Sequence, residues 1–218
     1  MAFVLAVIVA VTMSAFEAGA EEAGAVAAPR PIQLVALGDS LTAGYGLPRE
    51  AAFAAKLEKA LRARGLRVDV RNAGVSGDTV ADGLARLDWS VPEGTDAVII
   101  ELGANDALRG LDPRAARAGL DEIVKRLRQR NISIMLAGMY APRNYGPDYS
   151  ARFDQIYGEV AKAHDLPLYP FFLEGVAGDR TLNQPDGLHP TAAGIDVIVN
   201  RILPSVEAFL TKVAAQRP

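Results

Sequence analysis

Residues 32–47 read IQLVALGDSLTAGYGL, an apolar run followed by a glycine, an acid and a serine. Only Gln33 interrupts the apolar character of residues 32–37. Short, continuous apolar runs that end in turn residues are typical of strands buried on both faces, as in a parallel sheet. The stretch therefore predicts a buried strand that ends at Gly38, with Ser40 placed just beyond its tip.

The same strand character recurs along the chain, strongly in two segments and more weakly in two others: residues 96–102, 132–137, 68–72 and 166–169. Between the strands, apolar residues recur every three or four positions, as on the buried face of a helix. These stripes are Phe53, Leu57 and Leu61; Leu120, Ile123, Val124 and Leu127; Tyr149, Phe153, Ile156 and Val160; and Ile195, Ile198, Val199, Ile202 and Leu203. Gly65 is expected to cap the first helix, Asp112 and Pro113 to begin the second, and Pro204 to end or kink the last. The alternation predicts a three-layer α/β domain with right-handed crossovers.

The composition is that of an ordinary globular chain, with 218 residues, 50% hydrophobic and 22% charged. This length favours one domain, which we expect over residues 31–218. Cysteine is absent, which excludes disulfides, thiolate nucleophiles and cysteine-ligated metals. His164 and His189 are the only histidines, too few for a three-histidine zinc centre, so we expect neither metal nor cofactor. The net charge of −3 argues against nucleic acid as the main partner, because phosphate binding needs clustered Lys and Arg.

The N-terminal stretch has the pattern of a secretory signal peptide. Residues 2–13 are almost wholly apolar, but this run is shorter than the roughly 20 residues that span a bilayer. Residues 18–20 (AGA) form a small-residue cleavage site. We expect residues 1–20 to be removed, residues 21–30 to form a flexible leader, and the mature chain to be exported to the periplasm or medium without a membrane span. The first basic residue is Arg30, so the usual positive start is missing, and an uncleaved anchor or a disordered tail are the alternatives.

Chemically useful residues follow the predicted strands. In an open parallel sheet, ligands bind at the carboxyl ends of the strands. Ser40 follows the first strand, Gly77 lies in NAGVSGDT after the second, and Asn105 lies in LGAND after the third. Asp186 and His189 stand in DGLHP before the last helix. These groups are predicted to converge on one rim of the sheet.

Acyl transfer needs this set of groups. A serine hydroxyl becomes a nucleophile when an imidazole takes its proton, and a carboxylate orients that imidazole. Asp186 and His189, three residues apart in a turn, can supply both from one segment. The backbone N–H groups of Ser40 and Gly77, with the Asn105 side chain, can bind the oxyanion of the tetrahedral intermediate. His164 lies instead at a polar helix end, where a cation suits the helix dipole.

Four blocks in this order, GDSLTAGYGL, SGDT, LGAND and DGLHP, resemble the SGNH (GDSL) hydrolase superfamily. The resemblance is closer to its thioesterase I/protease I/lysophospholipase and bacterial arylesterase branch, includes GLARL, NYG and LPLYPFF, and covers roughly residues 32–210. It implies a flavodoxin-like α/β/α fold with a five-stranded parallel sheet in the order 2-1-3-4-5. It also implies Ser40 as the nucleophile, His189 as the base, Asp186 as its orienter, and Ser40, Gly77 and Asn105 as the oxyanion hole.

The expected substrate is a small carboxylic ester. Leu108, Leu111, Tyr140 and Tyr145 are apolar candidates for the wall of the groove and favour an acyl chain or an aromatic leaving group. Phenolate and thiolate are good leaving groups, because they depart from an ester or thioester with little need for a proton from the enzyme. We therefore expect a serine esterase that hydrolyses aryl esters of short to medium acyl chains through an acyl-Ser40 intermediate, and acyl thioesters more weakly.

Other activities and other classes of protein are the alternatives. A lysophospholipase, an acyl-CoA thioesterase or a carbohydrate acetylesterase could use the same catalytic residues. A nucleotide-binding module is disfavoured, because neither GxxxxGK[ST] nor GxGxxG follows a strand. An α/β-hydrolase needs G-x-S-x-G, which neither Ser40 nor Ser76 fits. An inactive lipid- or sugar-binding module has no need for all five candidate site residues.

Overall fold

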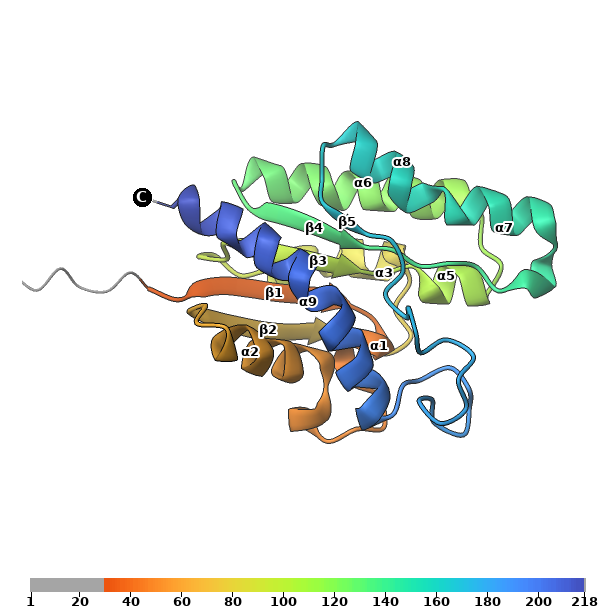
Figure 1. Ribbon diagram of the computed structural model, residues 1–218. Helices are drawn as coiled ribbons and strands as arrows, with labels where there is room; N and C mark the ends of the chain where they lie inside the picture. The colour runs from red at the N-terminus through yellow and green to blue at the C-terminus, as the bar shows by residue number, and fades with distance from the viewer. Residues whose placement is uncertain (1–29, 218) are drawn as a thin grey trace, which may run out of the picture.

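The structure is a computed structural model that describes residues 30–217 (Figure 1). The expected signal peptide, residues 1–20, and the expected leader up to residue 29 lie outside the described residues. Arg30, which ends that leader, is held by Asp96: its Nη1 and Nη2 each donate to one carboxylate oxygen at 2.7 Å. This bidentate ion pair fixes the position of the chain where it enters the first strand.

A five-stranded parallel sheet in the order β2-β1-β3-β4-β5 forms the middle layer. The strands are β1 Ile32–Gly38, β2 Val68–Gly74, β3 Ala97–Glu101, β4 Ser133–Ala137 and β5 Leu168–Tyr169. Each lies within or close to a segment predicted from the sequence, and the expected strand order is confirmed. Strand β5 is the shortest, because Pro167 has no N–H and joins the sheet only through its carbonyl, which accepts from the Leu136 N–H at 2.9 Å.

Helices cover both faces of the sheet. The longer ones are α2 Phe53–Ala63, α6 Pro113–Gln129, α7 Pro147–Asp154, α8 Ile156–Ala163 and α9 Ala192–Ala215, and the shorter ones are α1 Ser40–Ala43, η1 Arg49–Ala51, α3 Val80–Ala85, α4 Leu87–Ser90, α5 Ala104–Leu108 and η2 Arg143–Tyr145. Helices α2 and α9 pack together on one face, and α6 packs against α3 and α8 on the other (Figure 1). The predicted three-layer α/β/α architecture is confirmed. Within the described residues, every helix is too short or too polar to cross a membrane.

The predicted helix boundaries mostly agree with the structure. Gly65 follows α2 with φ +85°, and the N–H groups of Gly65 and Leu66 bond back to the last turn of the helix, as in a Schellman motif. The stripe that predicted one helix forms two, α7 and α8, which meet at Gln155. Helix α9 does not end at Pro204. Because Pro204 and Asn200 face solvent, the carbonyl that loses its partner remains open to water, and the buried residues on both sides hold the helix together.

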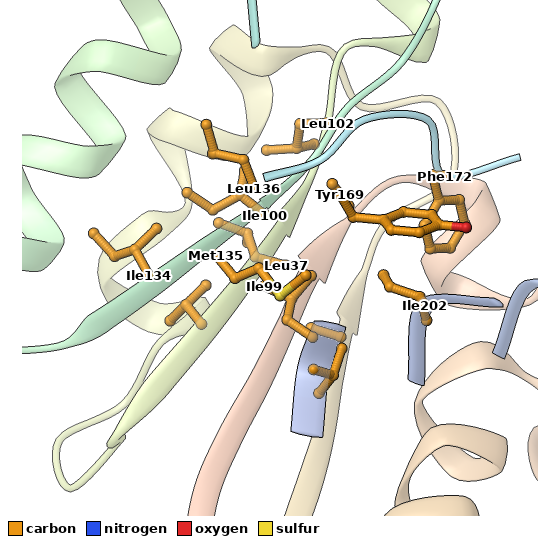
Figure 2. Packing of buried hydrophobic residues seen from close by; sticks show 14 of the residues in the cluster. Leu37, Ile99, Ile100, Leu102, Ile134, Met135, Leu136, Tyr169, Phe172 and Ile202 are labelled. Atoms are coloured by element: carbon orange, nitrogen blue, oxygen red, sulfur yellow. The ribbon is translucent and has the colours of Figure 1, made fainter. Parts of the chain in front are cut away.

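The core lies between the central strands and both helical layers. Leu37, Ile99 and Ile100 of β1 and β3 have no exposed surface, and Ile202 of α9 belongs to the same buried cluster (Figure 2). All five residues of β3 are buried, as expected for a strand covered on both faces. Burial of one such side chain contributes about 1.5–3 kcal/mol. The central strands therefore hold their carboxyl ends in fixed positions.

Candidate active site

Ser40 is held at the tip of β1 by a tight strand-to-helix turn. It is the first residue of α1, and the preceding Asp39 caps this helix by accepting from the Leu41 N–H at 2.9 Å. A Cβ at Gly38 would lie 2.1 Å from Thr42 Oγ1, so only glycine lets the turn close. Ser40 is mostly buried, at 9% exposure, but its hydroxyl reaches the open side of the sheet rim.

His189 connects Ser40 to Asp186. Its Nε2 lies 2.9 Å from Ser40 Oγ, and its Nδ1 lies 2.7 Å from Asp186 Oδ2. The other oxygen of Asp186 accepts the backbone N–H groups of Leu188 at 2.9 Å and of His189 at 3.0 Å. Hydrogen bonds from the backbone and then the ring of His189, together with the Leu188 N–H, lower the pKa of Asp186 to about 2. The carboxylate is therefore ionised at every pH at which the protein is expected to work.

Backbone and ring contacts hold the loop that carries this pair. The Gln184 N–H donates to the His189 carbonyl at 2.7 Å, and the Gln184 side chain donates to the carbonyls of Tyr45, at 2.7 Å, and Pro190, at 3.0 Å. The Tyr45 ring lies against the imidazole, with 4.5 Å between ring centroids. The segment that contains Tyr45 and the loop that carries His189 are far apart in the sequence, and these contacts hold them together.

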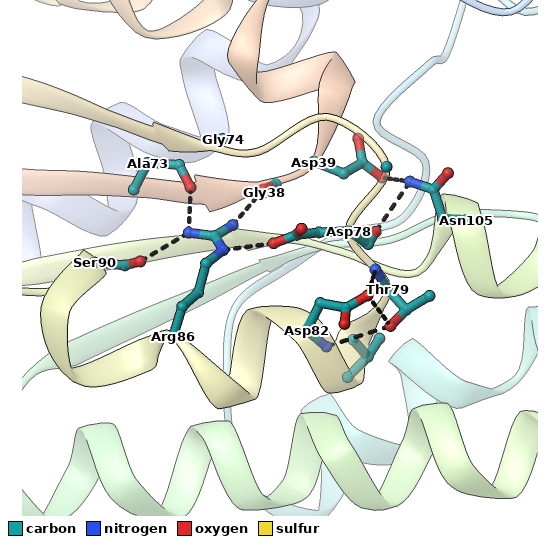
Figure 3. A network of polar contacts seen from close by, with 12 residues as sticks. Gly38, Asp39, Ala73, Gly74, Asp78, Thr79, Asp82, Arg86, Ser90 and Asn105 are labelled. Atoms are coloured by element: carbon teal, nitrogen blue, oxygen red, sulfur yellow. Dashed lines mark hydrogen bonds and ion pairs between the residues drawn. The ribbon is translucent and has the colours of Figure 1, made fainter.

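Gly77 lies on the loop that follows β2, and Asn105 lies in the first turn of α5, shortly after β3. Gly77 has φ +90°, a conformation that favours glycine, and its carbonyl accepts from Arg109 Nη2 at 2.7 Å. Asn105 Nδ2 donates to the Asp78 carbonyl at 2.9 Å and, at 3.2 Å, to Asp39 Oδ2 (Figure 3). The amide nitrogen of Asn105 is thereby tied to both the Ser40 turn and the Gly77 loop.

Two carboxyl groups lie buried beneath the Ser40 turn. Asp39 is fully buried, and burial raises its pKa to about 6 against the opposing effect of the Leu41 N–H. Glu101 is paired with Gly38 in the sheet, and burial followed by repulsion from Asp39 raises its pKa well above the usual value. Thr42 Oγ1 donates to one Glu101 oxygen at 2.7 Å, and the other oxygen is buried without a hydrogen-bond partner. These carboxyls hold protons more tightly in the folded state than in the unfolded chain.

We expect Asp39→Asn to stabilise the protein above about pH 6, by an amount on the order of 1–3 kcal/mol, because it removes a buried charge and keeps the cap to Leu41. The folded state retains a proton that the unfolded chain loses between about pH 4 and 6, so the wild type loses stability across that window. The variant lacks this loss. Urea unfolding from pH 4 to 8, with Asp88→Asn as the exposed control, measures the difference, and a gain that does not grow with pH contradicts the prediction.

A cavity of about 510 Å³ opens beside Ser40 and His189. Leu108 and Tyr140, two of the residues expected to contact substrate, line it. The other two, Leu111 and Tyr145, are exposed outside it, and the Tyr145 hydroxyl instead donates to the Leu108 carbonyl at 2.8 Å. The structure thus brings half of the expected wall to the nucleophile. In the described part of the chain, no group of three or more acidic or histidine side chains could hold a metal ion.

Most of the remaining cavity wall was not predicted from the sequence. Its apolar members come from the loop after β4 (Met139, Ala141 and Pro142), from the segment after β5 (Phe171, Leu173 and Ala177) and from the loop before His189 (Leu188). Tyr140 and Phe171 stack with 4.6 Å between ring centroids and form one side of the cavity. The apolar stretch LPLYPFF, which continues past the end of the last strand, is a signal that could have pointed to Phe171.

Residues 36–197 match the model of the GDSL-like lipase/acylhydrolase family. The chain belongs to this family. Esterase TesA of Pseudomonas aeruginosa is 39% identical over 178 residues, which cover 81% of this chain and 89% of that relative. An arylesterase of Vibrio mimicus is 40% identical over 159 residues, covering 72% of this chain and 80% of the relative. A solved structure of the psychrotrophic esterase EstA from Pseudoalteromonas sp., inhibited by monoethylphosphonate, has a TM-score of 0.78 and 33% identity, covering 82% of this chain and 98% of that one.

The resemblance inferred from the four sequence blocks is therefore confirmed. The protein is a GDSL-type hydrolase that acts on ester bonds, and its substrate is a small-molecule ester. The part that the family model matches includes all five candidate site residues: Ser40, Gly77, Asn105, Asp186 and His189.

Proposed function

We propose that the protein is a serine esterase in which Ser40 is the nucleophile, His189 the general base and Asp186 the group that orients the imidazole. The observation that carries this proposal is the continuous contact from Asp186 Oδ2 to His189 Nδ1, 2.7 Å, and from His189 Nε2 to Ser40 Oγ, 2.9 Å, beside an apolar cavity. The ionised carboxylate of Asp186 stabilises the imidazolium that forms when His189 takes the serine proton.

The reaction proceeds in two similar halves. Ser40 Oγ attacks the ester carbonyl, His189 takes its proton, and the carbonyl oxygen becomes an oxyanion. The N–H groups of Ser40 and Gly77 and the Nδ2 of Asn105 receive that oxyanion. The intermediate collapses to acyl-Ser40 as His189 returns the proton to the leaving alcohol. Water, activated by the same imidazole, then releases the acid and restores Ser40.

The cavity favours an apolar acyl chain of limited length. Its volume of about 510 Å³ is in the lower part of the usual range for small-molecule sites, and its wall is mainly aliphatic and aromatic. Arg143 and Asp154 form an ion pair at 2.6 Å, and the guanidinium places a charge on that wall. A phenolate is also a good leaving group, because it departs from an aryl ester with little need for a proton from the enzyme. We therefore propose aryl esters of short to medium fatty acids as the preferred simple substrates.

A p-nitrophenyl ester series from acetate to palmitate tests the substrate. We expect kcat/KM to rise from acetate to a medium chain and to fall at palmitate, because the longest chain exceeds the cavity. Acyl-CoA, a lysophospholipid and acetylated sugars are assayed in parallel. A steady rise to palmitate indicates a lysophospholipase, a higher rate on acyl-CoA indicates a thioesterase, and a preference for acetylated sugars contradicts the apolar acyl site.

We also propose that the protein is exported and that the mature chain begins at Glu21. The support is the apolar run at residues 2–13 followed by the small residues 18–20. The intact mass of the mature protein recovered from the periplasm or medium measures the start. A mature chain that retains residues 1–20 contradicts the proposal.

A further inference from the structure

One buried guanidinium lies behind the rim that carries Ser40, Gly77 and Asn105. It belongs to Arg86, which directly follows α3, stands in the GLARL block and is only 8% exposed. A buried arginine needs partners for its N–H groups, because an unpaired charge in the interior costs several kcal/mol. Figure 3 shows four hydrogen bonds from this side chain, which use four of the five N–H donors of a guanidinium.

The partners of Arg86 are the ends of the segments that carry the site. Nη2 donates to the carbonyl of Gly38, the last residue of β1, at 2.8 Å. Nη1 donates to the carbonyl of Ala73, near the end of β2, at 2.9 Å, and to Ser90 Oγ at 2.8 Å. Nε donates to Asp78 Oδ2 at 2.5 Å. One planar group thus holds two strand ends and the loop between β2 and α3.

Asp78 carries this restraint to the oxyanion donors. Its side chain is bound to Arg86, and its carbonyl accepts from Asn105 Nδ2 at 2.9 Å. Asp78 also follows Gly77 directly, so its position sets the direction of the Gly77 peptide. Arg86 does not line the cavity itself. It holds the carbonyl of Gly38, two residues before Ser40, while Asp78 directly follows Gly77 and its carbonyl accepts from Asn105 Nδ2.

We propose that Arg86 is a positioning residue for the oxyanion hole: it holds the carboxyl ends of β1 and β2 and, through Asp78, the amide of Asn105, so that the three donors converge. The inference rests on the proposed function, because it assigns a role in that reaction. This role depends on the planar guanidinium of Arg86, because the single ammonium group of a lysine cannot form hydrogen bonds in one plane to partners on three segments.

The test compares Arg86→Gln and Arg86→Lys with Arg130→Gln. Arg130 is the matched control, since its half-buried guanidinium also donates to two backbone carbonyls, Val91 at 2.5 Å and Pro92 at 3.2 Å, away from the site. We measure kcat and KM on a p-nitrophenyl ester well below each variant's Tm. We expect Arg86→Gln to lower kcat by about 10- to 100-fold with KM changed less than about threefold, Arg86→Lys to restore only part of kcat, and Arg130→Gln to keep the wild-type kcat.

A double-mutant cycle separates positioning from mere loss of stability. If Arg86 acts through the oxyanion hole, Arg86→Gln costs less in an Asn105→Ala background than in the wild type. A kcat within about twofold of wild type in folded Arg86→Gln, or effects of the two changes that simply multiply, overturns the proposal. If Arg86→Gln does not fold, Asp78→Asn removes the charged partner and keeps the carbonyl that Asn105 uses. A wild-type kcat in that variant also overturns the proposal.

The wild-type protein distinguishes this proposal from the proposed function. Absence of ester turnover and of fluorophosphonate labelling at Ser40 in the wild type contradicts the esterase mechanism. With an active wild type, the ratio of each variant to wild type reports on Arg86 alone.

Discussion

Ser40→Ala and His189→Ala are each expected to lower kcat on an aryl ester by about 10⁴- to 10⁶-fold. The first change removes the atom that forms the acyl intermediate. The second leaves Ser40 Oγ without the nitrogen that lies 2.9 Å away and takes its proton. Because the two groups act as one unit, the double variant should be little worse than either single variant. Steady-state kinetics with an active-site titration measures this.

The fold should be kept in both variants, since neither residue supplies core packing. Both lie at the sheet rim, and the His189 ring lies against the exposed ring of Tyr45. His164→Ala is the matched control, because His164 also pairs with an aspartate, Asp121 at 2.9 Å, but lies away from the cavity. Ser76→Ala is the control for an exposed serine near the site. Near-wild-type turnover in Ser40→Ala or His189→Ala, or a similar loss in the controls, contradicts the assignment.

The residues at the sheet rim could be predicted because apolar runs mark where strands end. Ser40, Gly77 and Asn105 each follow such a run, and the topology of a parallel sheet brings strand ends together whatever the side chains between them. The pairing of Asp186 with His189 could also be predicted, since both lie within one turn. Local sequence and one general rule of topology were therefore enough to assemble the candidate site.

The groups that support the site could not be predicted, because their partners are distant in the sequence. Arg86 bonds to the carbonyl of Gly38, and no side-chain pattern records a bond to a backbone oxygen 48 positions away. Asp39 and Glu101 become neighbours only through the pairing of Gly38 with Glu101 in the sheet. Register is a property of the assembled sheet, so the burial of these two acids emerges only in three dimensions.

Only two of the four residues predicted for the cavity wall line it, for a related reason. Proximity in sequence to Asn105 correctly pointed to Leu108, but Leu111 lies just past the end of α5 and outside the cavity. Phe171 and Leu188, in contrast, come from segments that join the cavity only when β5 and the last loop pack against the loop after β4. Which apolar residues meet at an opening depends on loop packing, which periodicity does not describe.

Asn105→Ala is expected to lower kcat by about 10²- to 10³-fold with little change in KM. In the free enzyme, Nδ2 of Asn105 donates to the Asp78 carbonyl at 2.9 Å and to Asp39 Oδ2 at 3.2 Å. The shorter bond fixes the direction of the amide, and the longer one is the bond that a developing oxyanion can replace. A donor that strengthens its contact only as charge develops contributes to the transition state and little to substrate binding.

Two comparisons make the Asn105 prediction specific. Loss of two hydrogen bonds also destabilises Asn105→Ala, by about 1–3 kcal/mol, so kcat is measured well below its Tm. Asn105→Asp keeps the shape but offers only acceptors, and it should lower kcat at least as much, because a carboxylate repels both the oxyanion and Asp39. A change confined to KM contradicts the prediction, since a residue that merely positions the ester or caps its loop affects the ground state and the transition state alike.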